Sequence, residues 1–103
     1  MMDKDSEPRY VISVAARIVG VQTHTLRYYE QIGIITPSRS QGNIRLYSER
    51  DVEQLCRVKT LMDDLGVNLA GIEVILRMTK RLAELQQKVE EMESRLREQG
   101  GGD

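Results

Sequence analysis

Apolar residues recur every three or four positions in two short segments near the start of the chain, and this spacing predicts two short helices. The first segment, VAARIVG, ends at Gly20, and Ser13 is placed to cap it. The second helix begins at Gln22 or Thr23 and reaches Gln31. Two short helices joined by a tight, glycine-containing turn are typical of a helix-turn-helix unit.

A different pattern follows the second helix. Pro37 excludes a helix interior, and the letters NIRLY alternate between apolar and polar side chains. Turn-forming residues lie between these two places, from Ser40 to Asn43. The segment therefore predicts a two-stranded hairpin that pairs residues 35–39 with residues 43–47.

Helical spacing returns after Ser48, which is expected to form a capping box with Asp51 at the start of a third helix. The apolar positions of this helix are Val52, Leu55, Val58, Met62 and Leu65. Gly66 ends the helix, and Asn68 caps a further one that begins with the letters LAGIEVILRM. Whether this last helix continues past Thr79 stays open from the sequence.

The last third of the chain carries apolar residues spaced alternately three and four apart, the a/d pattern of a coiled coil. These residues, called the seam below, are Ile75, Met78, Leu82, Leu85, Val89, Met92 and Leu96. A lone helix would leave this stripe in water, so the pattern predicts a homodimer through the C-terminal helix. The flanking charges fit a parallel pair, with Lys88 facing Glu93 of the partner subunit.

These elements predict a mainly α-helical protein with two parts. Residues 9–78 form a winged helix-turn-helix DNA-binding domain, and residues 79–98 form a coiled-coil dimerisation helix. The acidic N-terminus, residues 1–8, and the tail, residues 99–103, are expected to be disordered. In a winged helix-turn-helix, the second helix enters the major groove of DNA and the wing lies along the backbone.

The charge distribution agrees with this layout, although the net charge is only −1. Residues 9–47 hold five arginines and one glutamate, which is the kind of segregated basic charge that binds phosphate. A solvated basic surface is an equal alternative. Neighbouring helical residues point about 100° apart, so Tyr28 and Tyr29 cannot both face DNA, and one is expected to lie partly in the core. Arg27 can reach a guanine edge or a phosphate.

Other kinds of chemistry find little support in the sequence. With one cysteine there is no disulfide framework or Cys-rich metal site within the chain, and Cys56 is expected to be a small core residue. His24 lacks partner ligands for a metal and a nucleophile for catalysis. We therefore predict no enzyme activity and no cofactor. No run of 18 apolar residues is present, so no membrane partner is expected and a cytoplasmic protein is predicted.

Three motifs resemble the MerR family of bacterial transcription regulators: VISVAARIVGV, TLRYYE and GNIRLYSERDV. The likeness covers residues 10–78. Within that family, the letters VISVAA and GVNLAGI resemble the HspR-type heat-shock repressors. The resemblance implies a dimeric repressor that binds an inverted repeat near chaperone genes, with an Hsp70-type chaperone (DnaK) as co-repressor. It also implies an antiparallel pair of long helices, against the charge pattern.

The resemblance assigns roles to the residues that match the family motifs. Arg27 and Tyr28 match DNA-touching positions of the recognition helix, Arg45 and Tyr47 follow the wing turn, and Lys59 matches a phosphate-binding lysine. The DNA-contacting residues are therefore expected to be Arg17, His24, Thr25, Arg27, Tyr28, Arg39, Arg45, Tyr47 and Lys59. Metal-sensing members carry Cys ligands around the long helix and drug sensors append a further domain, and neither pattern is recognised here.

Two alternatives to a repressor stay open: a MerR-like activator, and an architectural protein that anchors another partner to DNA. The chaperone contact that the resemblance implies is expected within residues 93–103, because this stretch is polar and lies largely outside the seam.

Overall fold

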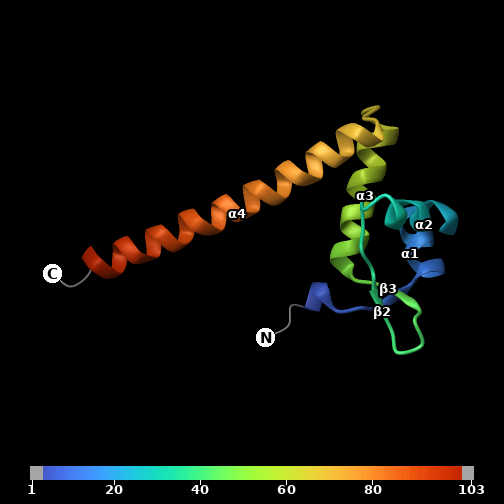
Figure 1. Ribbon diagram of the computed structural model, residues 1–103, viewed down its shortest axis with the longest axis horizontal. Helices are drawn as coiled ribbons and strands as arrows, with labels where there is room; N and C mark the ends of the chain where they lie inside the picture. The colour runs from blue at the N-terminus through green and yellow to red at the C-terminus, as the bar shows by residue number, and fades with distance from the viewer. Residues whose placement is uncertain (1–3, 101–103) are drawn as a thin grey trace. The chain divides into compact units, whose positions relative to one another are not determined.

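The computed structural model describes residues 4–100 of the 103-residue chain (Figure 1). The chain separates into two compact units, with the boundary between Leu69 and Ala70. The first is called the head below. Its elements are η1 (Lys4–Ser6), β1 (Tyr10–Val11), α1 (Ile12–Val19), α2 (Thr23–Gln31), β2 (Ser38–Arg39), β3 (Arg45–Tyr47) and α3 (Glu49–Asp63). The second unit is built on α4 (Leu69–Gly100).

The ends of the chain carry more regular structure than expected. Residues 4–6 form a short 3-10 helix, and residues 99 and 100 belong to α4, although both stretches were predicted to be disordered. Residues 1–3 and 101–103 of these two stretches lie outside the described residues, so the prediction is not tested there.

The predicted helix-turn-helix is present as α1 and α2. Gly20 adopts the left-handed conformation with φ 85°, and its N–H donates to the carbonyl oxygen of Ala16 at 2.8 Å. A glycine takes this conformation without the steric cost that a Cβ would add. The prediction that Ser13 caps the first helix is wrong, because α1 already begins at Ile12 and its N-cap is Val11. Val11 also pairs in β1, which fixes where the helix starts.

The wing is smaller than predicted and belongs to a larger sheet. Strands β2 and β3 pair in register Ser38 with Leu46, so the predicted strand 35–39 shortens to its last two residues. Strand β1 adds to the other edge of β3, with Tyr10 opposite Tyr47, giving the order β1-β3-β2. Below, "wing" means β2, β3 and the turn of residues 40–44 between them, which extends away from the helices of the head in Figure 1.

The core of the head lies where α1, α2 and α3 meet. Small residues on α1, Ala15 and Ala16, are buried, and their size allows the helices to approach closely. Leu26 of α2 and Leu55 of α3 are fully buried. No tryptophan or phenylalanine is available, so these aliphatic side chains supply the packing, together with the ring of Tyr47.

The predicted capping box at the start of α3 is confirmed. The Asp51 N–H donates to Oγ of Ser48 at 3.1 Å, and the Ser48 N–H donates to Oδ2 of Asp51 at 2.9 Å. Both bonds satisfy donors that a helix start otherwise leaves unpaired. Ser48 is only 7% exposed, so water has little access to replace its hydroxyl.

Ser48→Ala is expected to lower the free energy of unfolding by about 1–2 kcal/mol, the range for losing an N-cap. Urea unfolding followed by circular dichroism at fixed protein concentration measures the loss. Ser13→Ala is the matched control, because Ser13 is exposed inside α1 and caps nothing. The control is expected to change stability by less than about 0.5 kcal/mol. Equal effects of the two substitutions would contradict the assignment of the cap.

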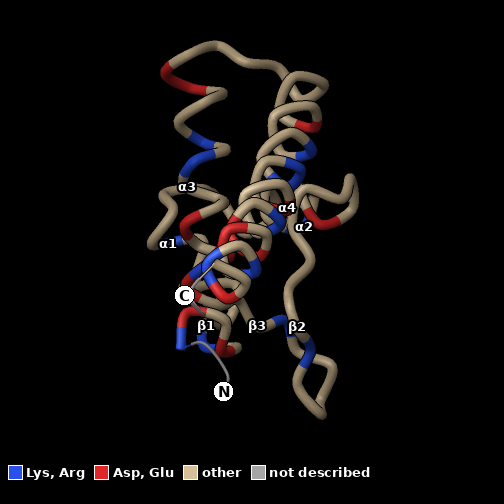
Figure 2. The backbone as a smooth tube through the Cα atoms, turned by 90° about the vertical axis from the view of Figure 1, so that its left-hand side faces the viewer, with Lys and Arg blue, Asp and Glu red and all other residues tan. Residues whose placement is uncertain are grey.

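Helix α4 is continuous over 32 residues, a length of about 48 Å. Thr79 does not interrupt it: its hydroxyl donates to the carbonyl oxygen of Ile75 at 2.8 Å, a bond within the helix. The predicted domain boundary after residue 78 therefore falls inside a helix. Acidic and basic positions are mixed along α4 (Figure 2).

The seam leaves apolar side chains in solvent along most of α4. Ile75 is half-buried, and the exposed fractions of the other members run from 42% for Leu85 to 67% for Leu96. The remaining exposed members are Met78, Leu82, Val89 and Met92.

Candidate nucleic-acid interface

Some side chains of helix α2 are buried in the core and others are exposed to solvent. Leu26 is fully buried and Tyr29 is 7% exposed, whereas Tyr28 is 45% exposed. The expectation that one of the two tyrosines lies in the core is thereby confirmed, and Tyr29 is that residue. Its hydroxyl contacts Sδ of Met62 at 3.5 Å, and burial raises the pKa of Tyr29. Tyr28 is therefore the tyrosine available to a ligand.

The solvent-facing side of α2 carries three of the predicted DNA-contacting residues. His24, Arg27 and Tyr28 are exposed, and their spacing of three and four positions places them on one helical face. Thr25 is half-buried nearer the core, and its N–H donates to the carbonyl oxygen of Gln22 at 3.0 Å. The face thus presents an imidazole, a guanidinium and a phenol, which are donors suited to phosphates and base edges.

Lys59 lies next to the helix-turn-helix although it comes from α3. A Cβ built on Gly20 would stand 2.9 Å from Nζ of Lys59, so the ammonium group sits against the turn between α1 and α2. Lys59 is half-buried, which restricts its long side chain. The lysine therefore holds a positive charge close to the start of the exposed α2 face.

Lys59→Ala is expected to weaken binding to specific and random DNA by similar factors, because an ammonium group on a phosphate carries no sequence information. The slope of log K against log salt should become flatter by about one unit. Fluorescence anisotropy with labelled duplexes at several salt concentrations measures both quantities. A loss confined to the specific duplex would contradict a phosphate contact.

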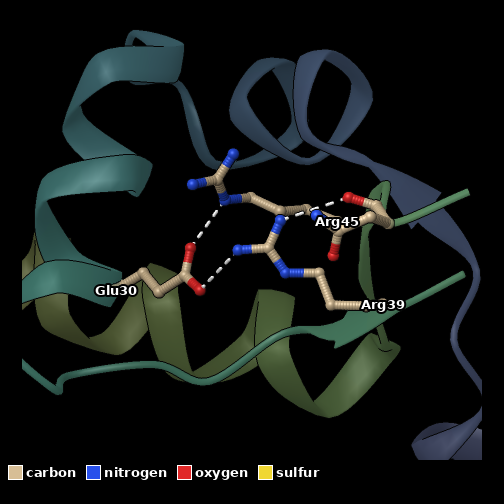
Figure 3. Close-up of polar contacts among 4 residues, drawn as sticks. Glu30, Arg39 and Arg45 are labelled. Atoms are coloured by element: carbon tan, nitrogen blue, oxygen red, sulfur yellow. Dashed lines mark hydrogen bonds and ion pairs between the residues drawn. The ribbon is translucent and has the colours of Figure 1, made fainter.

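The carboxylate of Glu30, on α2, binds two arginines of the wing (Figure 3). Nε of Arg45 donates to Oε1 of Glu30 at 2.6 Å, and Nη2 of Arg39 donates to Oε2 at 3.0 Å. These bonds, the one from Arg45 first, lower the pKa of Glu30, so the carboxylate stays charged to a lower pH than an ordinary glutamate. Glu30 was not among the predicted site residues. Its one sequence clue was that it is the only acid among residues 9–47.

The expectation that Tyr47 contacts DNA needs correction. Tyr47 is fully buried, and burial raises the pKa of its hydroxyl. Within the described part of the chain this hydroxyl has no hydrogen-bond partner. The ring is a core residue at the end of β3, so Arg45 is the residue of the R-x-Y motif for which a DNA contact is still expected.

Tyr47→Phe is expected to leave DNA affinity unchanged, because the hydroxyl does not reach the surface. The free energy of unfolding should stay the same or rise by up to about 1 kcal/mol, since an unpaired buried hydroxyl is removed. Anisotropy and urea unfolding measure the two effects. Tyr28→Phe is the contrasting variant, because the Tyr28 hydroxyl is exposed. Weaker binding by Tyr47→Phe with unchanged stability would restore the original assignment.

The structure brings together most, but not all, of the remaining predicted residues. The wing carries Arg39 and Arg45 opposite each other on its two strands (Figure 3). Arg17 is exposed on α1 and is not part of the α2 face. Cys56 is half-buried on α3, so its expected place in the core is corrected.

Residues 4–100 contain neither a metal cluster nor a membrane-spanning helix. Between residues 4 and 100, no three His, Cys, Asp or Glu side chains come together as a metal would require. No helix in that range is long and apolar enough to cross a membrane.

Comparison with known proteins supports the same fold and motifs. The sequence profile of the MerR HTH family regulatory proteins matches residues 10–79. A protein of Streptomyces coelicolor named for the heat shock protein HspR is 44% identical over 92 residues, which are 89% of this chain and 61% of that protein. The regulator GlnR of Bacillus anthracis is 35% identical over 82 residues, 80% of this chain and 63% of that protein. This chain thus spans about three fifths of each relative's length.

Solved structures show the same architecture. The crystal structure of HiNmlR, a MerR family regulator lacking the sensor domain and bound to promoter DNA, matches with a TM-score of 0.63 at 21% identity. The match covers 88% of this chain and 75% of that one. A MerR family regulator from Bacillus cereus gives 0.58 at 27% identity, covering 86% and 78%. The chain belongs to the MerR family of helix-turn-helix regulatory proteins.

Proposed function

We propose that this protein is a dimeric transcriptional repressor that binds an inverted repeat near chaperone genes. The observation that carries the DNA-binding part is the exposed face of His24, Arg27 and Tyr28 on α2, with Lys59 beside the preceding turn. The likeness to the Streptomyces HspR protein supports the heat-shock role. Such a regulator acts on chromosomal DNA, so we place it in the bacterial cytoplasm at the nucleoid.

Dimerisation accounts for both the seam and the inverted repeat. The exposed seam is an apolar stripe that a second copy of α4 can cover. A two-fold dimer presents two identical α2 faces, which fit two half-sites of opposite orientation. The antiparallel orientation of the helices follows the family resemblance. Exposed charge pairs contribute under about 1 kcal/mol each, so the charges flanking the seam need not decide the orientation of the two helices.

The signal that releases DNA is proposed to be the level of an Hsp70-type chaperone acting as co-repressor. Chaperone that leaves for unfolded clients would release DNA by mass action. Heating adds a second route, because the stability of a dimer depends on protomer concentration. The contact is proposed for residues 93–103, of which residues 93–100 continue α4 as an exposed helical end.

The test is a DNA-shift titration of the full chain with and without purified DnaK, at low and raised temperature. The duplexes are the upstream regions of the chaperone genes of the source bacterium and unrelated upstream regions of equal length. The expected result is tighter binding to the chaperone-gene duplex when DnaK is present, and weaker binding on heating. If DnaK leaves the midpoint unchanged and a metal ion or small molecule shifts it, the heat-shock assignment fails while DNA binding stands.

A further inference from the structure

The hydrogen bonds of Glu30 use particular atoms of the two wing arginines. Arg45 is held through Nε, and its two terminal nitrogens point away from Glu30 in Figure 3. Arg39 gives one terminal nitrogen to Glu30, and the other donates to the carbonyl oxygen of Asn43 at 3.4 Å, in the wing turn. One carboxylate therefore orients two guanidinium groups without neutralising both, and the cluster keeps one positive charge.

The wing has few other constraints on these arginines. Its strands are two and three residues long, and Arg39 and Arg45 are only partly buried, with side-chain exposures of 38% and 28%. A free arginine side chain loses rotamer freedom when it binds, and a side chain already held in place avoids most of that cost. Glu30 is 23% exposed and lies at the end of α2, three residues after Arg27.

We propose that Glu30 is a positioning residue for DNA recognition, which fixes the wing to α2 and directs the outer edge of Arg45 towards the nucleic-acid backbone. The inference rests on the proposed DNA-binding function. Glu30 itself does not touch DNA and acts through Arg39 and Arg45. It sets the distance between the α2 face and the wing, so the two reach one half-site in a fixed register.

Charge alone and positioning predict different results when Glu30 loses its carboxylate. A carboxylate near a polyanion repels it, so Glu30→Gln adds one net positive charge and should tighten binding to all DNA. Positioning instead predicts that the ratio of specific to random affinity falls, because arginines released from Glu30 bind phosphates in many registers. The two accounts are therefore distinguished by this ratio.

The experiment uses the full chain and two duplexes of equal length. One is recovered from a random library by repeated binding to the wild-type protein, and the other is unselected. Glu30→Gln changes the charge and keeps the side-chain size. Glu30→Asp keeps the charge and shortens the side chain by one methylene, so it cannot span both arginines in the same way. Glu53→Gln is the control, an equal charge change at an exposed residue of α3.

We expect both Glu30 variants to lower the specific-to-random ratio by about tenfold, the discrimination of one well-placed arginine contact. Glu53→Gln should leave the ratio unchanged. In an Arg45→Ala background the effect of Glu30→Gln should shrink to less than half, because Glu30 then has only Arg39 to orient. Circular dichroism melts and sedimentation confirm that each variant is folded and has the wild-type oligomeric state.

Two results would overturn the proposal. In the first, Glu30→Gln increases the affinity for both duplexes equally and Glu30→Asp binds as the wild type does. The charge of Glu30 would then account for its whole effect on binding. In the second, the ratio falls as much in the Arg45→Ala background as in the wild type. Failure of the proposed function is recognised separately, since the wild-type protein would then select no duplex from the library.

Discussion

Replacing Leu82 and Val89 by glutamate is expected to convert the proposed dimer into a monomer. Both side chains are exposed on α4, by 66% and 52%, and they lie one heptad apart on the seam. Two carboxylates on each helix would have to be buried against apolar side chains of the partner, which is strongly unfavourable. Deleting residues 79–103 should have the same effect, since it removes most of the seam.

The monomer should bind its specific duplex about 10²–10⁴-fold more weakly, because the second head no longer binds as part of the same molecule. Sedimentation velocity measures the mass, and fluorescence anisotropy measures the affinity. Binding to a duplex with a single half-site should change little, which separates loss of the dimer from damage to the head.

The matched control is Gln87→Glu with Ser94→Glu. These positions are also one heptad apart and add the same charge, but they lie off the seam. The control is expected to stay dimeric. A seam variant that remains a dimer, or a control that dissociates equally, would show that the two copies do not associate through this stripe.

Arg27→Ala is expected to cost about 1–3 kcal/mol of specific binding, a factor of roughly 5 to 150. Arg27 lies on the exposed α2 face, and its neighbour Leu26 is fully buried, so the helix is fixed against the core while the guanidinium faces solvent. Removing a side chain that reads a base edge should lower the affinity for the specific duplex far more than that for random DNA.

Arg57→Ala provides the control for this variant. Arg57 is an exposed arginine of the same compact unit, on α3, and its loss changes the net charge equally. Anisotropy at one salt concentration, with specific and random duplexes, measures both variants. Equal losses for the two would mean that Arg27 contributes only through long-range charge, and an unchanged affinity for a folded Arg27→Ala would assign the residue to a solvated surface.

The local features of this fold were predicted from the sequence because neighbouring residues determine them. The turn at Gly20, the extent of α2 and the capping box of Ser48 each depend on a few adjacent positions, and all three are confirmed. The rule that Tyr28 and Tyr29 cannot face the same way also follows from helix geometry alone. Only the packing of α2 showed that Tyr29 is the buried one.

Features that depend on pairing between distant segments were not predicted. Strand β1 is two residues long, too short for any periodic pattern, and it exists because β3 offers a free edge. Residues 4–6 likewise lacked a periodic pattern. The a/d spacing does cross Thr79, but spacing alone did not decide whether the helix breaks there, and the folded chain shows one continuous helix.

The tertiary structure changed the predicted set of interface residues most at Tyr47 and Glu30. The motif around Tyr47 suggested a surface role, but alternation along a strand does not say which face meets the core, and packing buries this ring. Glu30 is separated from Arg39 by nine residues and from Arg45 by fifteen, and the hairpin brings all three together. The sequence by itself determined the helices, the seam and the basic segment. Only the folded chain decided which of those charges are held in place, because that depends on contacts across the sheet and between the wing and α2.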